Sequence, residues 1–407
     1  MLSNYLGVLV IGGGTLLLYP IYIKILGGEL WGIVSACLLV QSFLFFFDAG
    51  LSQIMPRDIA RAKDSAHVYR GYFSFYFILS VIGAIILLIS SSWLAINWFN
   101  AGDNSGLLSL SFKVLSVQFF FQFFNNVNLG YWNGVQEQGI ANRRVCIFFC
   151  CKHALALIAI ILYRNPVAYV VAFSTICGLE FLINFYKIYN ERMTGERLFS
   201  FSDALHVLTA NFHFSVSVII GVISSQLDRI LVSKYVSVQI FGYYSLAVQL
   251  GLAFLQFQYP IIKALLPAIS GTRDYHKVKK IIKWSVSLVV AMLIPLIIVI
   301  VFSNDILQLY SGNAEFVRYS EKTFKLIIIS VAFNYIYGFI YTLMVNEGLG
   351  RYILICNISS ITVMSFYFFV FADKTSMVSG GWMWNLNVIT LLIMSSSFMI
   401  YRNFYRR

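Results

Sequence analysis

Long stretches of this 407-residue chain contain no Asp, Glu, Lys or Arg, and this absence constrains its fold more than any other feature. An α-helix needs about 20 apolar residues to cross a bilayer. Ten charge-free segments are close to that length or longer: residues 1–23, 30–47, 71–102, 114–136, 204–227, 235–262, 284–304, 326–346, 352–372 and 375–401. Two more, residues 145–163 and 167–188, carry one charge each, Lys152 and Glu180. We therefore predict an all-α polytopic membrane protein with about twelve transmembrane helices.

The composition supports this prediction. Hydrophobic residues make up 59% of the chain and charged residues only 11%, whereas soluble domains have about 25% charged residues. The apolar segments are continuous and do not alternate with polar residues, which favours helices over the strands of a β-barrel. The first segment lacks the basic start and the small-residue cleavage site of a signal peptide, so we expect it to be the first span.

The positions of the basic residues predict the orientation. With a cytoplasmic amino terminus, 19 of the 29 Lys and Arg residues lie in inner segments and 9 in outer segments. This bias follows the positive-inside rule, so we expect both termini in the cytoplasm and the chain in the inner (plasma) membrane. The net charge of +12 is then explained by loops that face an anionic leaflet, and no nucleic acid partner is expected.

An internal repeat divides the chain into two halves. Residues 26–32 (LGGELWG) followed by Ser35 are similar to residues 236–242 (VSVQIFG) followed by Ser245, and each copy leads to a proline, Pro56 or Pro267. Both copies fall on an outer loop that enters an inward-going helix, so the repeat is parallel. We predict six-helix lobes at residues 1–190 and 212–407, joined by a cytoplasmic linker at residues 191–211.

Two regions of the sequence resemble the polysaccharide flippases. The part similar to their first two helices contains residues 18–22 (LYPIY), 26–32 (LGGELWG), 47–53 (FDAGLSQ) and 56–61 (PRDIAR). Residues 226–232 (QLDRILV) and 242–249 (GYYSLAVQ) resemble their helices seven and eight. In length and number of spans the resemblance covers the whole chain. It points to the Wzx branch, the O-antigen translocases of the multidrug/oligosaccharidyl-lipid/polysaccharide exporter superfamily.

This resemblance implies a function in lipopolysaccharide O-antigen biosynthesis. A flippase of this kind moves an undecaprenyl-diphosphate-linked oligosaccharide from the cytoplasmic to the periplasmic leaflet by alternating access between two six-helix lobes. The expected partners are the lipid-linked oligosaccharide, membrane lipids and other O-antigen assembly proteins. No cofactor is expected.

Charged residues inside spans are costly and are therefore candidate functional residues. Lys152 and Glu180 each lie eight residues from the cytoplasmic end of adjacent antiparallel spans, so they can meet at equal depth. They either form a structural ion pair, or supply a lysine for the diphosphate and a carboxylate for proton coupling. His153 points about 100° away from Lys152 on the same helix, so one of the two faces another helix.

Two further candidate sites contain carboxylates. Asp48 lies in the inner half of span two, with Arg57 and Arg61 past its end. It either makes a helix–helix contact or a local pairing with a basic residue, or it is a coupling or gating carboxylate. Asp228 and Arg229 are adjacent near the outer end of span seven and therefore point to different faces. We expect them to stabilise a lobe interface or an outer gate more than to bind substrate.

Amides interrupt a run of phenylalanines on span four. Asn125 and Asn128 are three residues apart and share a helix face, so they either line a glycan-binding wall or form interhelical hydrogen bonds. The six cysteines lie in or beside apolar segments without zinc-ligand spacing, and we interpret them as packing residues. No metal site is expected.

No catalytic constellation is present in the sequence. The five histidines are isolated, and no H-E-x-x-H, G-x-S-x-G or Walker A motif occurs, so we do not expect an enzyme. Two alternatives remain open. An O-antigen polymerase or ligase would usually carry a long periplasmic loop, whereas the outer segments here are short. A multidrug exporter of the same superfamily would need less intramembrane positive charge than Lys152 and Arg229 provide.

Overall fold

The computed structural model describes residues 2–48, 50–192, 198–210, 212–258, 275–347 and 349–405, and these residues are almost entirely helical. Helices satisfy every backbone hydrogen bond within the segment, as lipid requires of apolar segments. The only extended pairing among the described residues is an isolated bridge between Asn100 and Ser237. The predicted all-α fold class is thus confirmed.

The chain divides into two compact units, residues 1–219 with 237–242, and residues 220–236 with 243–407. The residue ranges that we predict for the lobes and for their linker are not tested by this division and stay a prediction. Each unit is described separately below.

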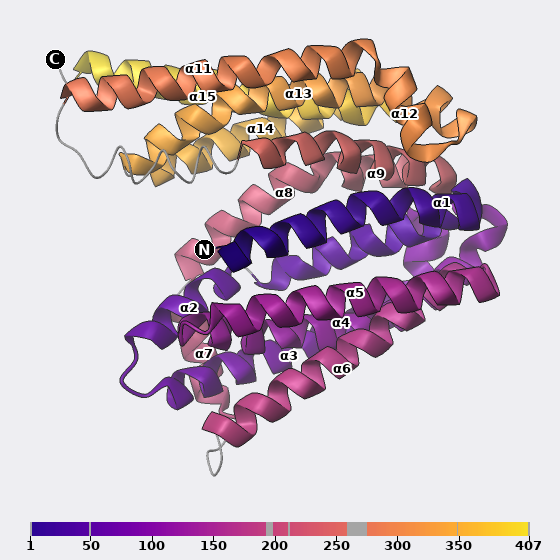
Figure 1. The fold of residues 1–407 in the computed structure, drawn as a ribbon, viewed down its shortest axis with the longest axis vertical. Coiled ribbons are helices and arrows are strands. Elements are labelled where there is room, and N and C mark those ends of the chain that lie inside the picture. The colour runs from indigo at the N-terminus through magenta and orange to yellow at the C-terminus, as the bar shows by residue number, and fades with distance from the viewer. Residues whose placement is uncertain are drawn as a thin grey trace. The chain divides into compact units, whose positions relative to one another are not determined.

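Unit 1 is built around α4, which packs most extensively against α6 and α3. Figure 1 shows α3, α4, α5 and α6 side by side in this unit. Its elements are α1 (Leu2–Leu44), η1 (Phe45–Asp48), α2 (Leu51–Arg61), α3 (Ser65–Trp93), η2 (Leu94–Trp98), η3 (Gly102–Asn104), α4 (Ser105–Gly134), α5 (Gln138–Tyr163), α6 (Pro166–Arg192) and α7 (Phe201–Ala210).

Unit 2 is organised around α13 and α15, whose contact is the most extensive in this part of the chain (Figure 1). Two of its helices, α8 and α9, begin in segments that belong to unit 1. The elements in this half of the chain are α8 (Phe212–Tyr235), α9 (Val238–Ala253), η4 (Phe254–Phe257), α11 (Tyr275–Val301), α12 (Ser303–Ser311), α13 (Ala314–Asn346), α14 (Gly350–Val370) and α15 (Val378–Tyr405).

Within the described residues, 9 helices are long and apolar enough to cross a membrane, or 10 if α11 and α12, which meet at a 74° bend, count as one span. The first of these, α1, covers the first predicted span from Leu2 onward and the second as far as Leu44, and its backbone leaves the helical conformation at Gly27 (φ 80°, ψ 168°). Most of the seventh predicted span, residues 204–227, lies in α8, which is not among these 9 helices. The exact number of twelve spans therefore stays a prediction.

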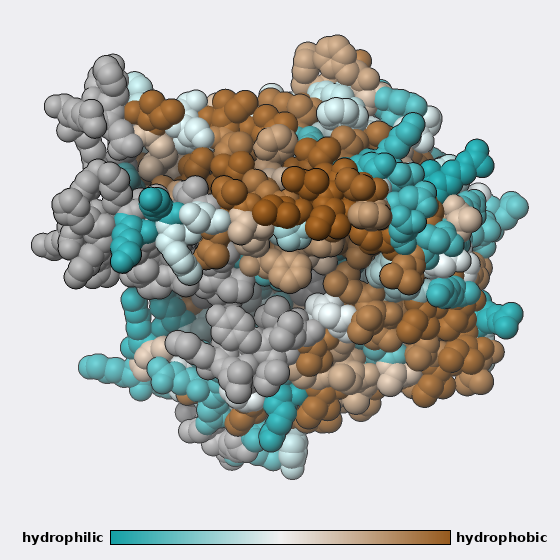
Figure 2. Space-filling view, turned by 45° about the horizontal axis from the view of Figure 1, so that its top comes forward, coloured by the Kyte–Doolittle hydropathy of each residue, from teal (hydrophilic) through white to brown (hydrophobic). Residues whose placement is uncertain are grey.

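The surface of the bundle is rich in large apolar side chains. On α5 alone Ile147, Ile158, Ile161 and Leu162 are all more than half exposed. Figure 2 shows a broad hydrophobic area on one face, with hydrophilic side chains gathered toward the margins. A surface of this kind needs an apolar environment, because water-soluble monomers expose only small apolar patches. The chain is a multi-pass membrane protein.

The two glycines that the repeat relates meet in the structure. A Cβ atom on Gly242 would lie 2.8 Å from the Cα of Gly32, and one on Gly32 would overlap the carbonyl oxygen of Val238. Close by, the Val238 amide donates to the carbonyl oxygen of Asn100 at 3.2 Å. The absence of a side chain is thus required at both copies. Pro267, the second repeat proline, lies outside the described residues.

The structure corrects the start of the seventh predicted span. We expect residues 204–227 to form one transmembrane segment, but residues 204–210 belong to the separate short helix α7. α7 packs against α3 through Ala204 and Val207, which are both buried. The prediction was wrong because this stretch lacks charges, and charge alone does not distinguish a span from a short amphipathic helix.

Candidate functional site

A band of polar side chains, here called the polar seam, crosses the interior of unit 1. Its members are Gln118, Gln122, Asn125 and Asn128 of α4 with Cys177 and Asn184 of α6. On α4 these residues recur every three or four positions, so they share one helix face. That face lies against α6, where polar groups must find partners within the protein because lipid offers none.

In one part of the polar seam, the side-chain oxygen of Gln122 accepts hydrogen bonds from several neighbours. Its Oε1 accepts hydrogen bonds from the Gln41 amide of α1 at 2.5 Å and from Gln118 at 3.2 Å. The Cys177 thiol lies 3.7 Å from the same oxygen. Three helices, α1, α4 and α6, are therefore joined at one side-chain oxygen. Cys177 is buried, as we expect for a packing residue, whereas Cys150 and Cys151 on α5 are exposed.

The predicted pair Asn125 and Asn128 lies farther along the polar seam. Asn125 Oδ1 accepts from Asn184 at 3.0 Å and from Asn128 at 3.2 Å, and the Tyr69 hydroxyl donates to Asn128 at 2.9 Å. Both asparagines are buried. Both asparagines therefore take part in interhelical hydrogen bonds, and their role in binding a glycan stays a prediction.

Lys152 and Glu180 meet as their equal depth predicts. The Lys152 Nζ atom donates to Glu180 Oε2 at 2.6 Å, and only 15% and 6% of the two side chains are exposed. The neighbouring His153 turns the other way, and its Nδ1 lies 2.7 Å from the Tyr22 hydroxyl of α1. The two adjacent residues of α5 thus face different helices. Their roles in transport are not tested by this geometry.

Asp48 is the last residue of η1, the short helix between α1 and α2. Its carboxylate accepts hydrogen bonds from the Tyr76 hydroxyl at 2.5 Å and from the hydroxyl of Ser52 at 2.7 Å. The hydroxyl of Tyr76 comes from α3, so Asp48 makes the helix–helix contact that was one of the alternatives, whereas the Arg57 guanidinium contacts Asp58 at 3.0 Å and is 53% exposed. The αL glycine Gly50 turns the chain between Asp48 and Arg57, and a coupling or gating role for Asp48 stays a prediction.

Asp228 and Arg229 lie in unit 2 and point to different groups, as adjacent helix positions predict. The Tyr244 hydroxyl donates to Asp228 Oδ2, and Arg229 Nη1 donates to Gln226 Oε1 at 2.8 Å. Asp228 is buried. Asp228 Oδ1 and Arg229 Nε are buried without a hydrogen-bond partner in the described part of the chain.

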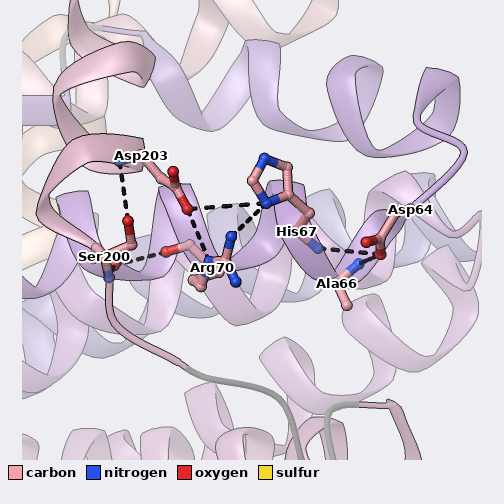
Figure 3. A network of polar contacts seen from close by, with 7 residues as sticks. Asp64, Ala66, His67, Arg70, Ser200 and Asp203 are labelled. Carbon is pink, nitrogen blue, oxygen red and sulfur yellow. Dashed lines mark hydrogen bonds and ion pairs between the residues drawn. The ribbon is translucent and has the colours of Figure 1, made fainter.

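A polar network that we did not predict fixes α7 to α3 (Figure 3). Asp64 caps α3 by accepting from the amides of Ala66 and His67. Arg70 Nε donates to Asp203 Oδ2 of α7 at 2.8 Å, and Arg70 Nη2 lies 2.6 Å from His67 Nδ1. A signal existed in the sequence, because Asp203, Ala204 and Val207 form one face of a short helix.

Asp203 lies outside the membrane-spanning segments. Partial burial raises the pKa of its carboxyl group, but the hydrogen bond from Arg70, the contact with Ser200 and the charges of Arg70 and His67 outweigh this effect and hold the pKa below its ordinary value. The carboxyl group is therefore ionised near neutral pH, which keeps the bond to Arg70 intact.

The candidate residues form separate clusters. In unit 1, the Lys152–Glu180 pair and the Asp48 cluster each satisfy their charges with their own neighbours, while Asp228 and Arg229 belong to unit 2. In the described part of the chain, no three His, Cys, Asp or Glu residues lie together as metal ligands would. The arrangement offers buried charges and amides at membrane depth, which suit the handling of a polar group inside an apolar bundle.

Comparisons with known proteins identify the family. Residues 23–314 match the model of a family described as polysaccharide biosynthesis protein. A Shigella flexneri protein assigned as an O-antigen transporter is 21% identical over 370 residues, which cover 89% of this chain and 88% of that protein.

Solved structures show the same fold. The lipid II flippase MurJ in an inward closed conformation superposes with a TM-score of 0.78 at 13% identity, over 97% of this chain and 86% of that chain. An inward-facing multidrug resistance transporter of the MATE family gives a TM-score of 0.66 at 16% identity, over 99% and 94% of the two chains. The resemblance to the Wzx branch of the exporter superfamily is thus confirmed. The chain belongs to the polysaccharide biosynthesis protein family and has the fold of the multidrug/oligosaccharidyl-lipid/polysaccharide exporters.

Proposed function

We propose that this protein is a flippase that moves undecaprenyl-diphosphate-linked O-antigen oligosaccharide units from the cytoplasmic to the periplasmic leaflet. The observation that carries the proposal is the family match over residues 23–314. It acts in the inner membrane with both termini in the cytoplasm, as the distribution of basic residues favours. Its partners are the lipid-linked oligosaccharide, membrane lipids and other O-antigen assembly proteins.

The substrate determines what the site must supply. A diphosphate carries negative charge that is costly inside an apolar bundle, so cations must replace part of its hydration shell. Lys152, Arg229 and Arg57 are the candidates for this contact at successive depths. Each has a side-chain partner in the structure: Glu180, Gln226 and Asp58, respectively. A cation that already has a partner is held in place and can exchange that partner for phosphate.

Lys152 illustrates this exchange. Its ammonium group contacts a single carboxylate, Glu180. A diphosphate presents more negative charge than one carboxylate, and the Coulomb energy of a contact grows in proportion to the charge. The diphosphate can therefore displace Glu180, and the return of Glu180 afterwards promotes release. Binding that is reversible in this way is what a carrier needs.

The energy source follows from the same features. The sequence has no nucleotide-binding motif, so the cycle is driven by an ion gradient or by the substrate itself. Asp48, Glu180 and Asp228 are the buried carboxylates that could couple to protons, because each is less than a tenth exposed. The family match and the similarity to a protein assigned as an O-antigen transporter favour a transporter of this kind. They do not favour a polymerase, a ligase or a multidrug exporter.

The test combines transport with protein amount. Surface O-antigen and membrane protein level are measured together for Lys152→Ala, Arg229→Ala and Arg57→Ala, with Lys152→Arg as the charge-preserving variant. Lys113→Ala is the control, because Lys113 is an exposed lysine on α4. We expect loss of surface polysaccharide at normal protein level for at least one alanine variant, and milder loss for Lys152→Arg. Normal polysaccharide at normal level in all three alanine variants would remove the cationic mechanism.

A further inference from the structure

Two cations share one tryptophan ring at the end of unit 1 where α4 turns into α5. The Arg144 guanidinium carbon lies 5.9 Å from the centroid of the Trp132 ring, and the Lys187 Nζ lies 5.6 Å from it. The three residues come from α5, α6 and α4, so this cluster, here called the tryptophan platform, is assembled only when the helices pack. None of the three was among our candidate residues from the sequence.

The tryptophan platform rests on a rigid base. Trp132 is completely buried, and its carbonyl oxygen accepts the Glu137 amide at 2.9 Å in the tight turn before α5. Two residues further on, a Cβ on Gly134 would lie only 2.7 Å from Ile59 of α2. The end of α4 is therefore locked between the turn and α2, and the ring has little freedom to move.

The Arg144 guanidinium is oriented by the polar seam. Its Nη1 donates to the Asn184 side chain and to the carbonyl oxygen of Ile183. Asn184 is fully buried and is itself bonded to Asn125. Lys187 is three residues from Asn184 on the same face of α6. Both cations therefore lie toward one side of α6, and the bond to Asn184 orients Arg144.

One donor in the tryptophan platform is left unused. The Trp132 Nε1 atom is buried and has no hydrogen-bond partner within the described residues. A buried N–H group without an acceptor is unfavourable, and an anion placed at this cluster would supply acceptor oxygens. This observation is independent of the two cations and points to the same kind of ligand.

The chemistry selects a phosphate. Arg forms paired hydrogen bonds to phosphate oxygens, and Lys adds a mobile point charge. Arg144 lies eight residues before Lys152 on α5, which places it about 12 Å nearer the membrane surface. By the predicted orientation this surface is the cytoplasmic one, where a lipid-linked substrate is first encountered.

We propose that Arg144 and Lys187 on Trp132 form a phosphate-binding site at the cytoplasmic surface of unit 1, which captures the diphosphate of the lipid carrier before it reaches Lys152. The proposal rests on the proposed flippase function. The phosphate of an anionic phospholipid has the same chemistry, so the experiment must separate the two sources.

Binding to the purified full-length protein in detergent tests the site. Undecaprenyl diphosphate and phosphatidylglycerol are titrated separately and complexes are counted by native mass spectrometry. The variants are Lys187→Gln, Arg144→Gln and Trp132→Phe. Arg143→Gln is the matched control, because Arg143 is exposed and adjacent to Arg144. Arg144→Gln also breaks the bond to Asn184 and could therefore disturb the fold. Lys187→Gln removes a charge without breaking that bond, and thermal unfolding is recorded for each variant.

We expect undecaprenyl diphosphate to bind about tenfold more weakly to Lys187→Gln and Arg144→Gln, the effect of losing one charge-assisted contact, and as tightly to Arg143→Gln as to the unmodified chain. Unchanged binding in folded Lys187→Gln and Trp132→Phe would overturn the site. A loss confined to phosphatidylglycerol would assign the site to a phospholipid and overturn the substrate role. If the unmodified protein supports surface O-antigen while these variants bind normally, only this inference fails and the proposed function stands.

Discussion

Lys152 and Glu180 are largely removed from water, so their contact stabilises the packing of α5 on α6 in addition to any part it has in transport. Removing one partner of a buried pair typically costs 3–5 kcal/mol, because the other charge is left without compensation. This value is an upper limit here, since 15% of the Lys152 side chain is exposed.

Exchanging the two identities tests whether the contact or the position of each charge is needed. We expect Lys152→Ala and Glu180→Ala each to lower the unfolding temperature and the amount of protein in the membrane. The double variant Lys152→Glu with Glu180→Lys should recover most of both, by double-mutant-cycle logic. Lys113→Ala, on the exposed side of α4, is the control and should change neither. Additive defects without recovery would mean that the pair does not form.

Asp203 makes a smaller contribution because it is partly exposed. Its side chain and that of Arg70 are 23% and 24% exposed, and contacts of this kind contribute about 0.2–1 kcal/mol. We expect Asp203→Asn to speed amide hydrogen exchange in α7 about two- to fivefold at pH 7, whereas Ser202→Ala, an exposed neighbour, should leave it unchanged. Equal exchange in Asp203→Asn and the unmodified chain would contradict the role of Asp203 in docking α7.

The sign of the pH dependence follows from the lowered pKa of Asp203. A carboxyl group whose pKa is lower in the folded state contributes stability above its ordinary value of about 3.9, and this stability is lost as the pH falls through the folded-state value. The docking of α7 should therefore be unaffected by Asp203 between pH 5 and 8. A change within that window, measured by exchange in α7, would have to arise from another group.

Contacts between neighbouring helices were predictable at the residue scale only where a short turn fixes their register. Lys152 and Glu180 flank the tight connection at Asn165, so their equal depth could be counted along the sequence. The partner of Asn125 could not be found in this way, because Asn184 belongs to α6 and the rotation of α6 about its axis is set by packing. The orientation of Arg144 toward Trp132 depends on the same packing.

At the scale of elements, α2 and α4 approach closely through two glycines. A Cβ on Gly130 would lie 2.6 Å from the sulfur of Met55, and one on Gly134 would lie 2.7 Å from the Cβ of Ile59 and 3.1 Å from the carbonyl oxygen of Pro56. Small residues four positions apart allow helices in membranes to pack closely. Met55 is flexible, whereas a β-branched side chain and a backbone carbonyl cannot move aside easily.

Three alanine substitutions separate these effects. We expect Gly134→Ala to cost about 1–3 kcal/mol through overpacking and Gly130→Ala to cost clearly less. Gly139→Ala should be neutral or slightly stabilising, because nothing lies within 4 Å of its added Cβ. Thermal unfolding in detergent gives the order. A Gly134→Ala protein as stable as Gly139→Ala would show that the α2–α4 contact is looser than described.

The helical character and the order of the long apolar segments were predictable because hydropathy and missing charges mark such segments directly. The short helix α7 was not, since its Phe201, Leu205 and Leu208 are exposed while Ala204 and Val207 are buried. Ser202, His206 and Thr209 interrupt these apolar residues, but none of them is an Asp, Glu, Lys or Arg. A prediction made from missing charges therefore does not separate α7 from the next span.

At the scale of the whole molecule, orientation underlies the proposed direction of transport. The excess of basic residues in alternate loops predicts cytoplasmic termini. A reporter that is active only in the periplasm, fused after Arg407, should be silent, while the same reporter after Asn104, in the predicted outer loop between α3 and α4, should be active. The reverse pattern would invert the orientation and place the Trp132 cluster on the periplasmic side.

The proposed flippase function can be measured as transport in a defined membrane. The purified protein is reconstituted into vesicles that contain undecaprenyl-diphosphate-linked oligosaccharide with a fluorescent sugar, and an impermeant quencher is added outside. We expect the fluorescent lipid of the inner leaflet to be quenched much faster than in protein-free vesicles. Lys152→Ala should slow this quenching, whereas Lys113→Ala should not. A rate equal to that of protein-free vesicles, with the protein folded and inserted, would contradict the assignment of a flippase.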